Sequence, residues 1–130
     1  MALIFPQVGE VLTLQNITNN TAPANLILHL YTNNITPSPT DTAGTYTEAN
    51  GFGYAAITLT GGSWSFTDAT PSSATYPQVT FTFNGNLGNV YGYYMTQNGI
   101  LLLAERFSTG PFSIVNNGDN IKITPTITAT

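Results

Sequence analysis

The sequence GNVYGYYMTQNGILLLAERF, residues Gly88 to Phe107, decides the fold of this chain. Two runs, Asn89 to Thr96 and Ile100 to Phe107, flank the dipeptide Asn98-Gly99, whose residues adopt the positive φ of a tight turn at little steric cost. The stretch therefore predicts a β-hairpin. Both runs carry apolar or aromatic side chains on both faces, so we expect the hairpin in the middle of a sheet or across a contact between subunits.

Further strands are expected on both sides of this hairpin, and no stretch shows the apolar spacing of a helix. Eight or nine antiparallel strands joined by polar turns predict an all-β fold, a single-domain, jelly-roll-like β-sandwich over residues 1–130. The other expected strands are Val8 to Gln15, Leu26 to Tyr31, Tyr54 to Thr60 and Ser63 to Thr67 as a second hairpin, Val79 to Asn84, Phe112 to Val115, and Asn120 to Thr128, with Pro125 at an edge or a bend.

Two segments fall outside this pattern of strands. Residues 1–7 form a short N-terminal arm, whose apolar part Met1 to Pro6 has no expected strand partner and is typical of arms that dock on a neighbour. Residues 32–53, from Thr32 to Gly53, form a long loop. Loops of this length in a small domain tend to carry function.

The composition excludes some classes of partner. Charged residues make up 6% of the chain, against about 25% in ordinary soluble proteins. The net charge is −4, and Arg106 and Lys122 are the only two Lys or Arg residues, so little is present to neutralise a nucleic-acid backbone. No apolar run approaches the length of a membrane span, and cysteine is absent. We therefore expect neither nucleic acid nor a membrane as a partner.

No catalytic or ligand-binding constellation stands out. His29, the only histidine, lies between Leu28 and Leu30 in an expected strand, which favours a structural role. Asp41 and Glu48 in the long loop are candidates for paired carboxylates or calcium ligands, but a turn role is more common for such an aspartate, and calcium-loop spacing is absent. We expect the protein not to be an enzyme and to use no cofactor or metal.

Glu105 and Arg106 place two charges on opposite faces of a leucine-rich strand, so at least one of them needs a partner. Glu105 pairs either with Lys122 or with backbone amides of a nearby loop; the alternative is an ion pair between subunits.

Four aromatic residues on expected strands also leave two interpretations open. Their alternation along strands indicates that they lie in the core, and the alternative is that they form a stacking platform for a sugar. The four are Trp64, Tyr91, Tyr93 and Tyr94.

Four blocks of the chain resemble small proteins of tailed bacteriophages, the cement or decoration proteins of the capsid. The blocks are residues 30–55, 77–85, 90–107 and 117–130. The resemblance implies a jelly-roll or related β-sandwich on the outside of the phage head in the virion, a homo-oligomer that is often a trimer at local threefold positions. Such a protein clamps neighbouring subunits of the major capsid protein. The alternative is a carbohydrate- or receptor-binding module of a phage tail fibre or tailspike, which has a similar composition.

The arm, the long loop and the paired charges supply the candidate partner-binding residues. They are Ala2, Leu3, Ile4, Phe5, Pro6, Asn33, Asn34, Ile35, Pro37, Tyr46, Glu105 and Arg106.

Overall fold

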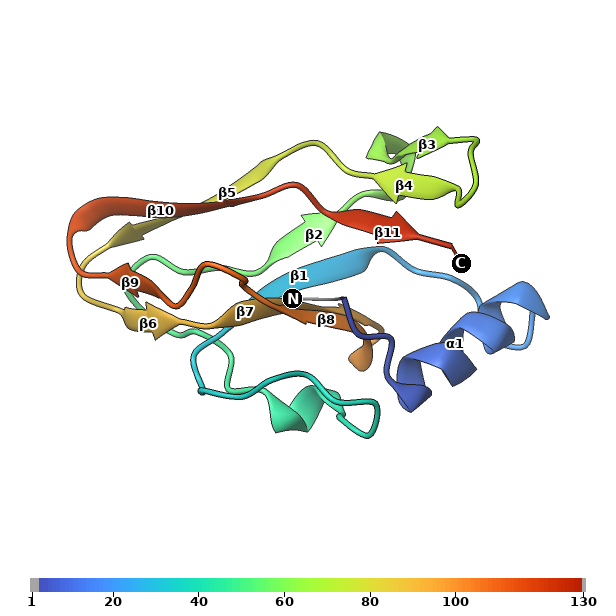
Figure 1. The fold of residues 1–130 in the computed structure, drawn as a ribbon, viewed down its shortest axis with the longest axis horizontal. Coiled ribbons are helices and arrows are strands. Elements are labelled where there is room, and N and C mark those ends of the chain that lie inside the picture. Colours follow the sequence, from blue (N-terminus) through green and yellow to red (C-terminus); the bar gives the residue numbers. More distant parts are fainter. Residues whose placement is uncertain (1–2, 130) are drawn as a thin grey trace.

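In the computed structural model, which describes residues 3–129, the predicted hairpin forms one half of a four-stranded antiparallel sheet, so its second strand lies at an edge and not in the expected middle (Figure 1). Its turn is the expected one, because Asn98 and Gly99 have φ values of 53° and 78°. The sheet has the order β2-β1-β7-β8 and contains β1 (Leu26–Tyr31), β2 (Ile57–Leu59), β7 (Gly92–Gln97) and β8 (Ile100–Arg106).

A second layer of strands faces this sheet in Figure 1. In it, β5 (Val79–Asn84) pairs with β10 (Asn117–Ile123), and β4 (Ser73–Thr75) pairs with both β3 (Ser65–Thr67) and β11 (Thr126–Thr128). Pro125 separates β10 from β11 and so marks the expected bend. The pair β6 (Gly88–Val90) and β9 (Phe112–Ile114) lies at one end, and two short 3₁₀ helices cover Ala43–Thr45 and Gly61–Ser63.

The main core fills the space between the two layers. The four-stranded sheet contributes one face of each strand, and the facing layer contributes the alternate residues of β5 and β10, as expected for strands with one buried face. Buried members of this core include Leu28, Leu30, Leu59, Met95, Leu103, Phe81, Phe83, Ile121 and Ile123.

A second, smaller apolar cluster covers the other face of the same sheet. Tyr31, Tyr94, Leu101 and Ala104 are buried there against Tyr46 of the long loop. The loop is the cyan to green segment that passes below β7 and β8 in Figure 1. The two-sided apolar pattern of the hairpin is therefore satisfied within one molecule and does not require a subunit contact.

The helix α1 (Gln7–Ile17) corrects the prediction of a strand at Val8 to Gln15 and the expectation that the chain has no helix. Pro6 precedes the helix, a position that suits proline because the first backbone amides of a helix need no internal partner. Gly9 and Leu12 are buried against β8. Apolar residues also lie on the opposite side of α1, so no single apolar stripe marks it as a helix.

Other expectations about pairing were wrong. Tyr54 to Thr60 and Ser63 to Thr67 do not form a hairpin, because β2 pairs with β1 and β3 pairs with β4. The run Asn89 to Thr96 is divided at Tyr91 into β6 and β7, which belong to different sheets. The described residues contain eleven strands where eight or nine were expected. The all-β class is confirmed, and the jelly-roll connectivity stays a prediction.

The N-terminal arm has a partner, contrary to expectation. Ile4 pairs with Ala104 at the edge of β8, since the Ile4 amide donates to the Ala104 carbonyl at 2.7 Å and the Ala104 amide donates to the Ile4 carbonyl at 3.0 Å. The arm thus extends the four-stranded sheet by one short bridge.

Candidate functional site

The candidate residues of the long loop make contacts within the same chain. The side-chain amide of Asn33 donates to the Thr45 carbonyl at 3.0 Å, and its oxygen accepts the Thr47 amide at 2.9 Å. Pro37 and Tyr46 are buried. These residues shape the loop and hold it on the sheet, and their role in binding a partner stays a prediction.

Arg106 brings three of the candidates together. Its guanidinium donates to the Asn34 side-chain oxygen at 2.9 Å and to the Ile35 carbonyl at 3.0 Å, and it lies over the Tyr91 ring at 5.2 Å. The positive charge is thereby used to fasten the start of the loop to the end of β8.

Glu105 has a partner that neither interpretation of the sequence named. Tyr93, directly opposite on β7, donates its hydroxyl to the carboxylate at 2.6 Å. Burial and this hydrogen bond raise the pKa of Tyr93. Within residues 3–129, Glu105 makes no ion pair with Lys122, and the ion pair between subunits remains untested.

The arm residues are divided between the core and the surface. Pro6 is buried, Leu3 packs against the main core and Phe5 is exposed. Ile4 pairs with β8, and Ala2 lies outside the described residues. The arm meets the long loop where the Gln7 amide donates to the Pro39 carbonyl at 2.9 Å.

His29 stands in an arrangement that resembles a hydrolase triad. Its Nδ1 lies 2.8 Å from a Glu48 carboxylate oxygen, and its Nε2 lies 2.9 Å from the Thr96 hydroxyl. However, Thr96 is only 5% exposed, so its hydroxyl is closed to a substrate. The Tyr54 hydroxyl also donates to Glu48, at 2.7 Å. The network holds the long loop against β1, which supports a structural role for His29.

The other acidic candidate has a turn role. Asp41 accepts the Ser38 amide at 2.9 Å and the Tyr46 hydroxyl at 2.8 Å, separately from Glu48. In the described part of the chain, no three His, Cys, Asp or Glu residues are grouped so that they would hold a metal ion.

Most of the aromatic candidates lie inside the fold. Tyr93 and Tyr94 are buried, and Tyr91 packs against the smaller cluster below Arg106. Trp64 is half-buried and packs edge to face on Tyr76. These contacts support the interpretation of the four residues as packing residues.

An exposed apolar surface on and beside α1 was missed by the sequence analysis. We call it the α1 surface. Val11, Leu14 and Ile17 are 53%, 61% and 74% exposed, which is unusual for three such residues on one side of a helix. The α1 surface consists of Phe5, Val11, Leu14, Ile17 and Ile100.

Two shallow hollows flank the helix, and four of these side chains line one or the other. Val11 and Ile100 line a hollow of about 440 Å³ on one side. Phe5 and Leu14 line another of about 400 Å³ on the other side, with Glu10 as its only charged residue. The signals that would have revealed the helix were Pro6 at its start and Glu10 in its first turn.

Searches of protein families, curated proteins and solved structures found no match to this chain. Among the described residues, no helix combines the length and the apolar character that crossing a membrane requires.

Proposed function

We propose that this chain is a structural virion protein, a capsid cement or decoration protein of a tailed bacteriophage. It binds the outer surface of the phage head and stabilises contacts between subunits of the major capsid protein. It acts as a homo-oligomer, a trimer at local threefold positions, and it is not an enzyme.

The observation that carries this proposal is the α1 surface. A helix that is apolar on its outer side as well as its buried side normally has protein on both sides. Leu14 points away from the sheet, with Val11 and Ile17 on either side of it along the helix. Several exposed apolar side chains on one helix are typical of a docking site.

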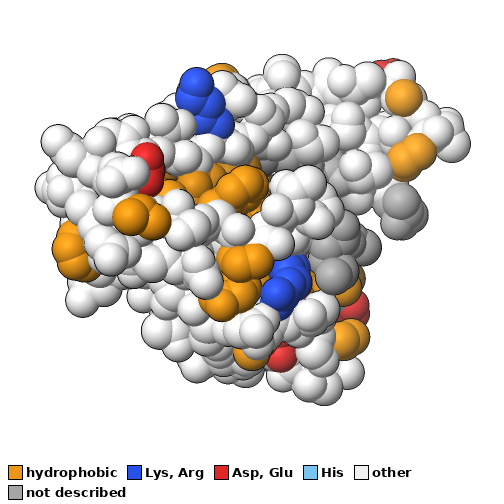
Figure 2. Space-filling view, turned by 60° about the vertical axis from the view of Figure 1, so that its left-hand side comes forward, with side chains coloured by type: hydrophobic (Ala, Val, Ile, Leu, Met, Phe, Trp, Pro, Cys, Tyr) orange, Lys and Arg blue, Asp and Glu red, His pale blue; other side chains and the backbone are white. Residues whose placement is uncertain are grey.

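The scarcity of charge supports the same type of contact. Figure 2 shows a face on which uncharged atoms predominate and hydrophobic side chains gather in a hollow between the two layers. With 6% charged residues and a net charge of −4, the protein has little means of long-range attraction. Its affinity for a shell then rests on apolar contact, repeated over several copies.

The oligomer is proposed on a different basis from the one the sequence suggested. The apolar hairpin is covered within one molecule, whereas the α1 surface is not covered by any described residue of the same chain. We therefore assign the proposed contacts, with the capsid or with further copies, to the α1 surface.

The first test counts the copies of the protein in purified virions by quantitative mass spectrometry, with the major capsid protein as the internal standard. Hundreds of copies are expected for a head decoration protein. A handful of copies would contradict the proposal and favour the alternative, a carbohydrate- or receptor-binding module of a phage tail fibre or tailspike.

The second test measures binding to heads that lack the protein. Leu14→Gln with Ile17→Gln is expected to lower binding at least about tenfold, since two apolar side chains of a docking surface become polar. Val115→Gln is the matched control, because Val115 is also exposed but lies beyond β9, at the far end of the molecule from α1. Equal binding by both variants would contradict the role of the α1 surface.

A further inference from the structure

A hollow of about 420 Å³ lies at the end of the second layer, on the small sheet formed by β11, β4 and β3. Phe66, Ala74 and Ile127 stand in one row across the three strands, because Ala74 is opposite both other residues in the strand register. The row forms an apolar floor, which Ala129 extends. The volume lies within the range of sites for small molecules.

An exposed aromatic ring stands at the side of this floor. Phe66 is 78% exposed, more than any other large hydrophobic residue that the structure describes. It lies on β3, an edge strand of its sheet. Its ring is therefore available to contact a ligand in the hollow.

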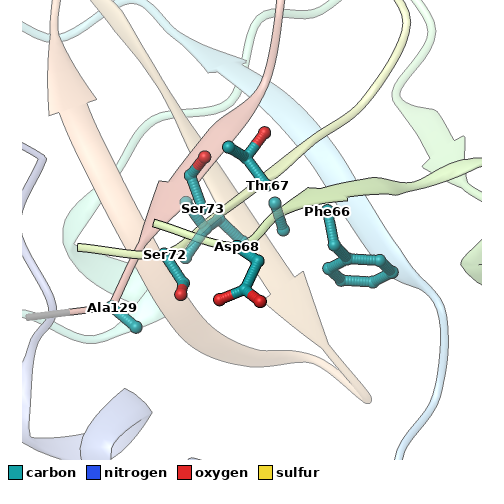
Figure 3. A pocket seen from close by; sticks show the side chains of 8 residues that line it. Phe66, Thr67, Asp68, Ser72, Ser73 and Ala129 are labelled. Atoms are coloured by element: carbon teal, nitrogen blue, oxygen red, sulfur yellow. The ribbon is translucent and has the colours of Figure 1, made fainter. Parts of the chain in front are cut away.

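A carboxylate without a partner lies beside the ring. Asp68 directly follows β3, two residues after Phe66, and both side chains line the same hollow. Figure 3 shows the carboxylate and the ring next to each other at the hollow. Within residues 3–129, the Asp68 carboxylate makes no side-chain hydrogen bond and no ion pair, whereas Ser72 is already bonded to the Ala69 carbonyl at 2.9 Å.

The chemistry of the lining selects the class of ligand. An aromatic face attracts the weakly positive C–H groups on one face of a sugar ring, and a carboxylate accepts hydrogen bonds from hydroxyl groups. Small side chains, Ala74 and Ala129, let a flat ring approach the floor. None of the described residues that line the hollow carries a positive charge, so phosphates and acidic sugars are disfavoured.

We infer that this hollow binds a neutral saccharide, with the sugar ring stacked on Phe66 and its hydroxyl groups bonded to Asp68. The site differs from the four aromatic residues that the sequence singled out. It goes beyond the proposed function and does not depend on it, because the isolated protein carries the whole site.

The test uses saturation-transfer NMR on the intact protein. The probes are the methyl pyranosides of glucose, galactose, mannose and N-acetylglucosamine, with glucuronic acid as an anionic probe and methylguanidinium as a cationic one. Because Trp64, the only tryptophan, lies two residues before Phe66, its fluorescence gives a second readout. At least one neutral pyranoside is expected to bind at millimolar concentration and to receive saturation from aromatic protons.

Two substitutions locate the binding. Phe66→Ala and Asp68→Asn are each expected to weaken it about tenfold, through loss of stacking and loss of the charged acceptor. Phe52→Ala is the matched control, since Phe52 is exposed but lies outside the hollow. All three variants are expected to keep the circular dichroism spectrum of the parent protein.

Three results would overturn the inference. The first is no transfer to any neutral pyranoside. The second is binding that Phe66→Ala leaves unchanged. The third is stronger binding of methylguanidinium than of every sugar, which would mean that the ring and the carboxylate receive a basic side chain of a partner.

Discussion

At the scale of single residues, Gly9 determines how closely α1 approaches β8. A Cβ atom at this position would collide with the backbone carbonyl of Leu102. The carbonyl belongs to a strand and has little freedom to move, so any larger residue has to displace the helix from the sheet.

Gly9→Ala is therefore expected to lower the free energy of unfolding by about 1–3 kcal/mol. This sign is diagnostic, because alanine otherwise stabilises a helix relative to glycine by roughly 0.5–1 kcal/mol. Urea unfolding measures the change, with Gly62→Ala as the control, since a Cβ there meets no atom within 4 Å. A stabilised Gly9→Ala protein would contradict the close packing of α1 on β8.

Gly99 is needed for its backbone conformation. Its φ of 78° is unfavourable for a β-branched residue, and nothing lies within 4 Å of a Cβ placed there. Gly99→Val is expected to cost about 1–3 kcal/mol, with Gly62→Val nearly neutral. Thermal unfolding gives the comparison, and equal melting temperatures for the two variants would argue against the tight turn between β7 and β8.

At the scale of elements, the long loop behaves as part of the core. Its Tyr46 ring lies 4.9 Å from the rings of both Tyr31 and Tyr94. The loop covers a sheet face that would otherwise expose aromatic side chains to water. Shortening the loop is therefore expected to impair folding, which circular dichroism would detect.

Burial of these tyrosines predicts a loss of stability at alkaline pH. Burial raises the pKa of Tyr31 and of Tyr94 from 10.0 to about 12. Between these values the unfolded chain holds fewer protons than the folded one, so the free energy of unfolding falls as the pH rises above about 10. Below that pH both states are protonated and this contribution is constant.

Urea unfolding over a pH series, with tyrosinate absorbance recorded in parallel, measures this effect. Tyr31→Phe with Tyr94→Phe removes two of the ionising hydroxyls and is expected to flatten the alkaline decline relative to the parent protein. Ionisation of all tyrosines near pH 10 without any loss of structure would show that the smaller cluster is accessible to water.

The sequence predicted those elements whose pattern is long enough to be read. The strands Leu26–Tyr31 and Val79–Asn84 have six residues each and match the expectation at both ends. The turn at Asn98-Gly99 was predictable because these two residue types readily adopt positive φ. Strands of three residues, such as Ser73–Thr75, are too short to show a period. The helix was missed because its two apolar sides cancel in any test for amphipathicity.

The choice of candidate site residues depended on which side chains are exposed, and a sequence does not show this directly. Tyr46 and Pro37 were chosen as loop residues but are buried, whereas Leu14 and Phe66 were assigned to strands and are exposed. Local composition did not distinguish these cases, because strands β7 and β8, which the loop covers, lie far from it along the chain.

At the scale of the whole molecule, sparse charge determines how the protein meets its partner. Binding to phage heads is expected to change little between low and high salt, because few charges exist for salt to screen. Cosedimentation with heads over a salt series measures this. A heterologous phage decoration protein rich in charged residues serves as a positive control, and release of this protein by moderate salt alone would contradict apolar docking.

The bridge between Ile4 and Ala104 has a consequence for the handling of the protein. It occupies the outer edge of β8, whose segment Ile100 to Ala104 contains neither a charge nor a proline. A bare edge with such a sequence is a template for fibril growth. Cleavage of the arm by a contaminating protease is therefore expected to start amyloid-like deposition, which thioflavin fluorescence would detect, and intact preparations are expected to stay clear.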